Sequence, residues 1–247
     1  IRRDSPDAVK LFRAYAVLEV AVPDNIALAV SDIESDTAQH LLADPYLEGV
    51  LREEQDGRRI YHALLADHIR GNLSGTDARR YHDRAIAVYR ECLTPGDQAE
   101  TLAAMRLPEH VLTAHGNRAF LEIVNIVHPF LDRLGLWACR RSLLERAIKK
   151  ATDDKGQIAR FLLEIGNTFS YQNRYDEALN YFCQAESAYA EVNDQVGQAR
   201  ANVRQGEIYR KLNTPNDAQK CLHEALELIR KTPEAAARLV EAHCHVT

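Results

Sequence analysis

Cysteine is scarce in this sequence, and each cysteine stands alone. The five lie at Cys92, Cys139, Cys183, Cys221 and Cys244. Zinc ribbons and redox motifs use closely spaced cysteine pairs, and no such pair occurs here. A disulfide framework, a structural zinc site and a dithiol redox centre are therefore not expected, and single thiols favour the reducing cytoplasm.

Long apolar runs and targeting signals are also missing. No stretch approaches the roughly 18 apolar residues that a membrane helix requires. The first residues, Ile1-Arg2-Arg3-Asp4, do not resemble a secretory signal. We therefore expect a cytoplasmic protein with no membrane partner. Because the chain starts without methionine, we expect it to be part of a longer protein.

Motifs for nucleotide binding and catalysis are absent as well. The sequence contains no G-x-x-x-x-G-K-[ST] phosphate loop, no G-x-G-x-x-G turn after a strand, and no recognisable Ser/His/Asp or Cys/His set. We therefore expect this chain to be non-catalytic, with neither a cofactor nor a metal of its own. Its net charge of −5 argues against bulk attraction to nucleic acid or to membranes.

Glycine and proline are sparse, at 11 and 8 of 247 residues, which is typical of a mainly α-helical fold. The most informative pattern is an internal repeat with a period of forty residues. Five positions of small and large side chains recur with the same internal spacing. They are Leu162, Gly166, Phe169, Ala178 and Ala185, which recur as Asn202, Gly206, Tyr209, Ala218 and Ala225.

Side-chain size explains why this pattern predicts paired helices. Gly166 and Phe169 belong on the first helix of a pair and Ala178 on the second, where small residues let two helices approach closely. Phe182 and Leu222 fill the large position between the alanines of each copy. The pattern resembles the tetratricopeptide repeat over residues 159–192 and 199–231. The resemblance implies stacked helical hairpins that form an open superhelix.

A third, degenerate copy of the repeat fits residues 121–152. His128 stands at its glycine position, and Arg140 stands at its first small position. We therefore expect a looser hairpin, with Arg140 and Arg141 on a solvated helix face. One more helix is predicted over residues 233–243.

The first 74 residues follow a different plan. Helices are predicted over 7–20, from Pro23 through Val30, and from Ser35 or Asp36 to Pro45. Asp56-Gly57 is the strongest hairpin signal, with a returning strand from Arg58 to Tyr61. Three helices and a hairpin predict a winged-helix domain at 1–74. A helical connector is predicted at 75–120 and tetratricopeptide-like repeats at 121–247. A helix over 63–72 precedes the connector, and helices over 77–92 and 98–115 lie within it.

The order of these parts resembles the regulatory half of signal-transduction ATPases with numerous domains (STAND, NB-ARC-like). Tyr61, His62 and Leu64 fit a short motif of that family at the end of the wing, although Ala63 replaces its usual aspartate. The resemblance implies that an N-terminal nucleotide-binding module of the same chain holds ADP or ATP. It also implies that His62 contacts the β-phosphate of ADP and keeps the molecule autoinhibited. A single histidine at a strand end is, however, commonly an ordinary surface residue.

The first helices of the repeats offer a candidate groove for a protein or peptide ligand. Basic side chains and an amide could hold an acidic peptide or a chain terminus there. The candidate groove residues are Arg160, Asn167, Tyr171, Arg200, Arg204, Glu207 and Lys211. Asn167, Arg200 and Arg204 resemble the carboxylate clamps of tetratricopeptide proteins. A merely solvated helix face is the simpler alternative.

A transcription regulator is the alternative function, with a winged helix that binds DNA and repeats that bind a peptide. Such a domain needs cationic side chains that contact phosphates. From Ala21 to Leu51 the sequence has no lysine or arginine but six acidic residues, and the nearby cations are Arg52, Arg58 and Arg59. Because this segment would repel a phosphate backbone, nucleic acid is not an expected partner.

Overall fold

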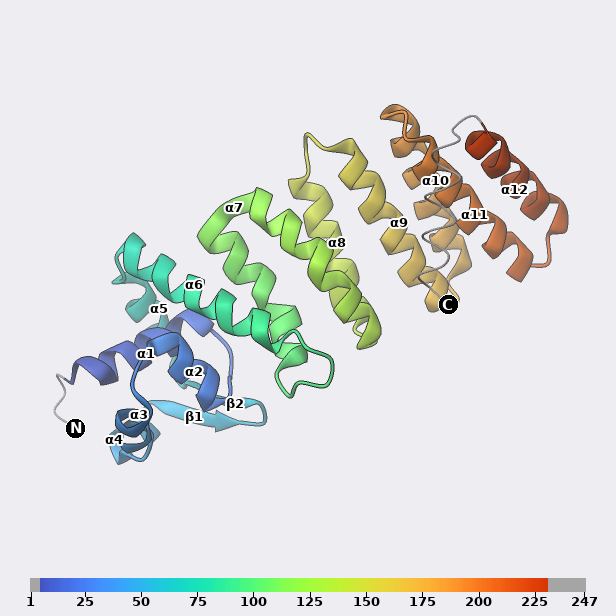
Figure 1. Ribbon diagram of the computed structural model, residues 1–247. Helices are drawn as coiled ribbons and strands as arrows, with labels where there is room; N and C mark the ends of the chain where they lie inside the picture. The colour runs from blue at the N-terminus through green and yellow to red at the C-terminus, as the bar shows by residue number, and fades with distance from the viewer. Residues whose placement is uncertain (1–4, 231–247) are drawn as a thin grey trace. The chain divides into compact units, whose positions relative to one another are not determined.

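The chain is mainly α-helical, as predicted, with a single two-stranded hairpin in the part that the structure describes (Figure 1). The structure is a computed structural model. It describes residues 5–230, apart from the side chains of residues 35, 36, 38, 39, 46 and 48. The elements are α1 Pro6–Leu18, α2 Asp24–Ser31, α3 Ser35–Leu42, α4 Pro45–Glu48, β1 Leu51–Glu54, β2 Gly57–Ile60, α5 Ala63–Gly71, α6 Gly75–Cys92, α7 Glu100–Arg133, α8 Trp137–Lys150, α9 Lys155–Tyr171, α10 Tyr175–Glu191, α11 Gln195–Lys211 and α12 Pro215–Arg230.

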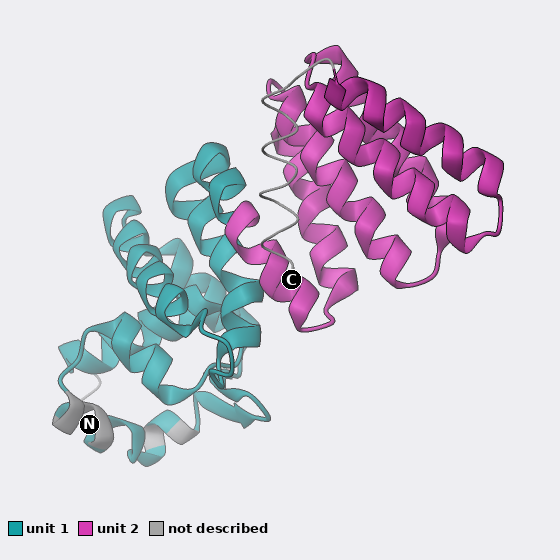
Figure 2. Ribbon diagram, turned by 45° about the vertical axis from the view of Figure 1, so that its right-hand side comes forward, with its two compact units in different colours: residues 1–123 teal, residues 124–247 magenta. Residues whose placement is uncertain are grey.

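Two compact units divide the chain, one of residues 1–123 and one of residues 124–247 (Figure 2). The first unit contains α1 to α6, the hairpin and most of α7. The second contains the end of α7 and α8 to α12. The predicted helix over 233–243 lies outside the described residues.

The hairpin forms where Asp56-Gly57 predicted it, and its register pairs Leu51 with Ile60. It is joined to the linker between α1 and α2, because the backbone of Val22 exchanges hydrogen bonds of 2.9 and 3.0 Å with that of Arg58. The sequence did not predict α4. Pro45 predicts the end of a helix, but proline is equally suited to the first position of a new helix.

The core of the first unit is built from α1, α2 and α6. Apolar spacing along α1 buries Leu11, Tyr15 and Leu18 completely or nearly so, which is why this helix contacts α2, α5 and α6. Tyr81 and Tyr89 of α6 are buried at 0% exposure. In contrast, α5 has no buried residue at all.

The element α7 is two helices rather than one. Gly116 has φ 77° and ψ −167°, so the helical path breaks there. Glycine adopts this conformation at little cost, whereas other residues do not. The first helix therefore ends near His115, where the sequence predicted an end, and a second helix follows from residue 117 to Arg133.

In the second unit, α9 with α10 and α11 with α12 form the two hairpins that the repeat predicts. A Cβ atom added to Gly166 would lie 2.5 Å from the ring of Phe182. A Cβ atom at Gly206 would lie 3.1 Å from Leu222. Gly166 and Gly206 therefore have equivalent surroundings, and each lets its helix approach the large side chain of its partner.

The joints between these helices also repeat. Asp154 and Asp194 cap α9 and α11, and their carboxylates each accept a hydrogen bond of 2.9 Å from a backbone N–H three residues later. Asn173, Asn193 and Asn213 end α9, α10 and α11 with positive φ of 58°, 55° and 60°. Asparagine tolerates this left-handed conformation better than most residues.

Candidate functional site

His62 lies at the exposed end of the hairpin, immediately before α5. Its backbone is extended, with φ −96° and ψ 110°, so it forms the N-cap residue of that helix. The ring of Tyr61 meets the His62 ring edge-on, with 6.1 Å between centroids, and the guanidinium of Arg52 lies 5.5 Å from the Tyr61 centroid. The imidazole is therefore accessible to a partner rather than committed to the core.

The residues next to His62 in the sequence include large apolar side chains that are exposed to solvent. Leu64 is 73% exposed and Tyr61 is 59% exposed, with Leu65 at 38%. A hollow of about 360 Å³ opens beside them, and Arg59 and Arg70 contribute to its wall. Both cations are already paired, Arg59 with Glu54 at 2.7 Å and Arg70 with Asp67 and Glu19. The exposed feature here is apolar and aromatic rather than cationic.

The candidate groove residues fall on one face of α9 and α11. Residues 160, 164, 167 and 171 have the spacing of a single helix face, and residues 200, 204, 207 and 211 follow it exactly one repeat later, on a helix that contacts α9. The structure therefore brings the predicted residues together on neighbouring helices.

Most of these side chains already have partners within the chain. Arg204 pairs with Glu207 at 2.9 Å, and the amine of Lys211 lies 5.5 Å from the Tyr175 centroid. Asn167 donates a hydrogen bond of 3.4 Å to Glu164. Within residues 5–230, Arg160 and Arg200 are exposed and make no ion pair. Tyr171 is 54% exposed.

Arg140 corrects a prediction, because it is buried rather than solvated. Its side chain is only 3% exposed and binds α9, where Glu164 accepts at 2.5 Å and the Thr168 hydroxyl also at 2.5 Å. Asp132 lies 3.4 Å away, and the Nδ1 atom of His128 lies at the same distance. The third copy of the repeat therefore replaces a small-residue contact with a buried polar cluster.

The titratable groups around Arg140 have shifted pKa values. Burial lowers the pKa of His128, with the neighbouring arginines contributing in the same direction and Glu164 opposing them. Burial also raises the pKa of Asp132, against the effect of Arg140. The neutral His128 ring can therefore accept a hydrogen bond from the guanidinium.

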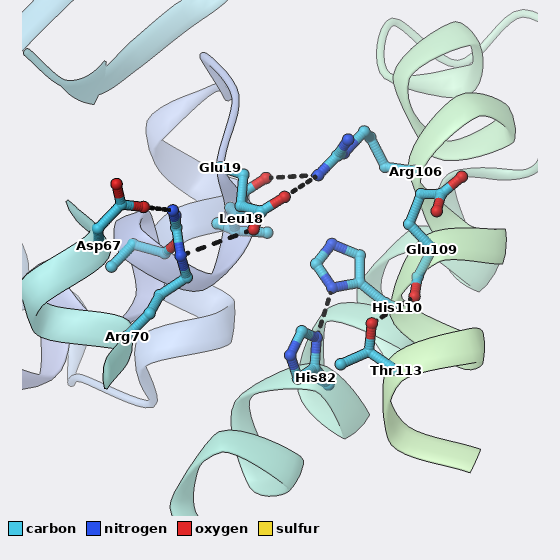
Figure 3. A network of polar contacts seen from close by, with 10 residues as sticks. Leu18, Glu19, Asp67, Arg70, His82, Arg106, Glu109, His110 and Thr113 are labelled. Atoms are coloured by element: carbon cyan, nitrogen blue, oxygen red, sulfur yellow. Dashed lines mark hydrogen bonds and ion pairs between the residues drawn. The ribbon is translucent and has the colours of Figure 1, made fainter. Parts of the chain in front are cut away.

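A second buried polar cluster lies between α6 and α7 in the first unit, and the sequence analysis missed it. The Nδ1 atoms of His82 and His110 are 2.8 Å apart, and the Tyr89 ring lies 5.5 Å from the His110 ring. Burial lowers the pKa of His110 to about 3 and also lowers that of His82. Figure 3 shows this pair beside Arg106, which donates to the Leu18 carbonyl and to Glu19 at 3.2 Å.

Among the described residues, no group of three or more histidine, cysteine, aspartate or glutamate side chains could hold a metal ion. No helix in the same part of the chain is both long and apolar enough to cross a membrane.

Comparison with known families identifies the repeats. Residues 159–191 and 199–232 match the model of the tetratricopeptide repeat, as the spacing of small and large side chains predicted. Such repeats are stacked helical hairpins that present extended binding surfaces. The second unit is therefore a scaffold of the kind that mediates protein–protein interaction. The comparison with curated proteins gives no match.

Several solved structures resemble the chain. They include BtubC from P. vanneervenii, with 14% identity, 66% of this chain and 59% of that chain covered, and a TM-score of 0.42. A STAND protein with a tetratricopeptide repeat sensor from Pyrococcus horikoshii has 11% identity, coverage of 92% and 38%, and a TM-score of 0.43. Aspartyl phosphate phosphatase F from Bacillus subtilis has 14% identity, coverage of 94% and 76%, and a TM-score of 0.42. The chain thus spans 59% of BtubC and 38% of the STAND protein, and similarity at this level carries no conclusion about function.

Proposed function

We propose that the chain is the non-catalytic regulatory part of a cytoplasmic signal-transduction ATPase. In this proposal the repeats at 121–247 bind a protein or peptide. The connector at 75–120 and a winged helix at 1–74 relay that event to a nucleotide-binding module elsewhere in the parent protein. ADP or ATP belongs to that module, and this chain has no cofactor of its own.

The observation that carries this proposal is the exposed apolar surface around His62. Tyr61 and Leu64 are more than half exposed. They lie next to the accessible His62 imidazole, which precedes α5, a helix with no buried residue. Clustered apolar side chains in solvent are typical of surfaces that another domain covers. A transcription regulator is less well supported, because α2 to α4 carry no lysine or arginine.

In the parent protein, we expect the substitution His62→Ala to speed the release of bound ADP by about ten- to a hundredfold. An imidazole that donates to a phosphate makes a charge-assisted hydrogen bond, whose loss costs about 1.5–3 kcal/mol. Release of a fluorescent ADP analogue after addition of excess ATP measures the effect. His68→Ala is the matched control, because His68 is also exposed on α5. An unchanged release rate for His62→Ala would show that His62 is not a nucleotide sensor.

For the groove, we expect the 247-residue chain to bind fluorescein-labelled hexaglutamate and not hexalysine. Arg200→Gln should weaken the binding of hexaglutamate by about three- to fivefold, as loss of an exposed ion pair does, and added salt should weaken it further. Fluorescence anisotropy measures both effects. Lys220→Gln removes the charge of an exposed side chain on α12 and serves as the control. Equal binding of both peptides would exclude an acidic ligand.

A further inference from the structure

Arg160 and Arg200 occupy the same place in successive repeats. They lie forty residues apart on α9 and α11, two helices in contact. Both side chains are exposed, and within the described residues neither makes an ion pair, unlike Arg204 in the same groove, which binds Glu207 at 2.9 Å. Two guanidinium groups on neighbouring helices are thus available to a ligand.

Tyr189 of α10 is held against the start of α11, close to these arginines. A Cβ atom added to Gly197 would lie 2.2 Å from the Tyr189 ring, so glycine at this position is what allows the ring to lie there. Gly197 precedes Arg200 by three residues, about one helical turn on the same face. Tyr189 itself is only 6% exposed, so its ring is fixed in place.

The Tyr189 hydroxyl is a neutral hydrogen-bond donor that both arginines influence. Burial raises the pKa of Tyr189 to about 12, and Asp194 and Glu164 act in the same direction. The positive charges of Arg160 and Arg200 both oppose that rise. Within the described residues, the hydroxyl makes no hydrogen bond to another side chain. The phenol therefore stays protonated near neutral pH, with two cations close to it.

The two carboxylates that raise the pKa of Tyr189 already have other partners. Asp194 accepts a hydrogen bond of 2.9 Å from the Gly197 backbone, and Glu164 is bound by the buried Arg140 at 2.5 Å. Neither carboxylate makes an ion pair with Arg160 or Arg200. The positive charges of these two arginines are therefore available to an anionic group of a ligand.

We propose that Arg160, Tyr189 and Arg200 form a subsite for a phosphorylated side chain of the peptide that occupies the groove. This proposal rests on the groove function above and adds the chemical class of one ligand residue. A phosphoryl group carries about two negative charges at neutral pH and three strong acceptor oxygens. It therefore matches two cations and one hydroxyl donor. A carboxylate carries one charge and offers two oxygens in a plane, so it leaves part of this set unmatched.

The test compares three labelled peptides on the 247-residue chain, Glu-Glu-Ser-Glu-Glu with serine, with phosphoserine, and with glutamate at the central position. We expect phosphoserine to bind about tenfold more tightly than serine, and clearly more tightly than glutamate, because charge-assisted bonds to phosphate are strong. Tyr189→Phe should reduce the preference for phosphoserine over glutamate severalfold. Tyr209→Phe removes a hydroxyl from α11 at a position outside the candidate groove and should leave the preference unchanged.

The outcomes distinguish failure of the phosphate subsite from failure of the proposed peptide groove. Equal affinity for phosphoserine and glutamate would overturn the phosphate subsite and leave an acidic-peptide groove. Loss of binding by all three peptides would instead overturn the groove. Inorganic phosphate should compete only at far higher concentration than the phosphopeptide. Competition at equal concentration would show a site for free phosphate and not for a peptide.

Discussion

Replacement of Arg140 by methionine is expected to lower the free energy of unfolding of the second unit by about 3–5 kcal/mol. Methionine keeps most of the side-chain length, so the loss comes from charge and hydrogen bonds rather than from volume. Glu164 and Asp132 would remain without their cation in a partly buried setting, and breaking a buried ion pair from one side costs about this much.

The fluorescence of Trp137 reports on this region during denaturant unfolding, because the sole tryptophan of the sequence lies at the start of α8. Lys149→Met on the same helix removes an exposed charge and should change stability by less than about 0.5 kcal/mol. The double variant Arg140→Met with Glu164→Gln should regain part of the loss, because it no longer strands that carboxylate. An Arg140→Met variant as stable as Lys149→Met would contradict the buried cluster.

Acidification is expected to destabilise the first unit progressively between about pH 6.5 and pH 3. Burial holds the pKa of His110 at about 3 in the folded chain, against an ordinary value of 6.5. Below about pH 6.5 His110 binds a proton in the unfolded chain, whereas folded His110 stays neutral until the pH approaches 3. Stability is therefore complete above about pH 6.5 and is lost as pH falls, by about 1.4 kcal/mol per pH unit. His82 adds to the loss, because its pKa is lowered as well.

Denaturant titrations at several pH values, followed through amide resonances of α6, measure this loss. His110→Gln should flatten the pH dependence of the unfolding free energy, whatever its effect at neutral pH. His82→Gln provides a second variant that removes one imidazole of the pair. A pH dependence that is the same in wild type and both variants would assign the acid sensitivity to other groups. The second unit is less suited to this test, because the raised pKa of Asp132 opposes the effect of His128.

The sequence alone predicts the repeats, because the contacts between small and large side chains join residues at short, regular spacings along the chain. Gly166 with Phe182, and Gly206 with Leu222, can be paired by spacing, since the helical period brings small and large residues to facing positions. The hairpin at Asp56-Gly57 was equally readable from turn chemistry. The period of forty also placed the candidate groove residues on equivalent faces of α9 and α11.

The buried polar clusters could not be predicted in this way. Arg140 was assigned to solvent because an arginine is rarely fully buried, and its burial depends on Glu164, twenty-four residues later. His82 and His110 are likewise twenty-eight residues apart, and no short motif links them. Contacts of this kind become visible only once the helices are packed. The role of His62 rests on family resemblance and on its exposure, so it stays a prediction.

The three asparagines that close α9, α10 and α11 recur every twenty residues, at Asn173, Asn193 and Asn213. The smallest repeating unit is thus one helix together with the asparagine that ends it. This unit is half as long as the forty-residue repeat of small and large side chains. In such arrays each helix touches mainly its immediate neighbours. Duplication or deletion of hairpins could therefore lengthen or shorten the array during evolution while the remaining joints keep their geometry.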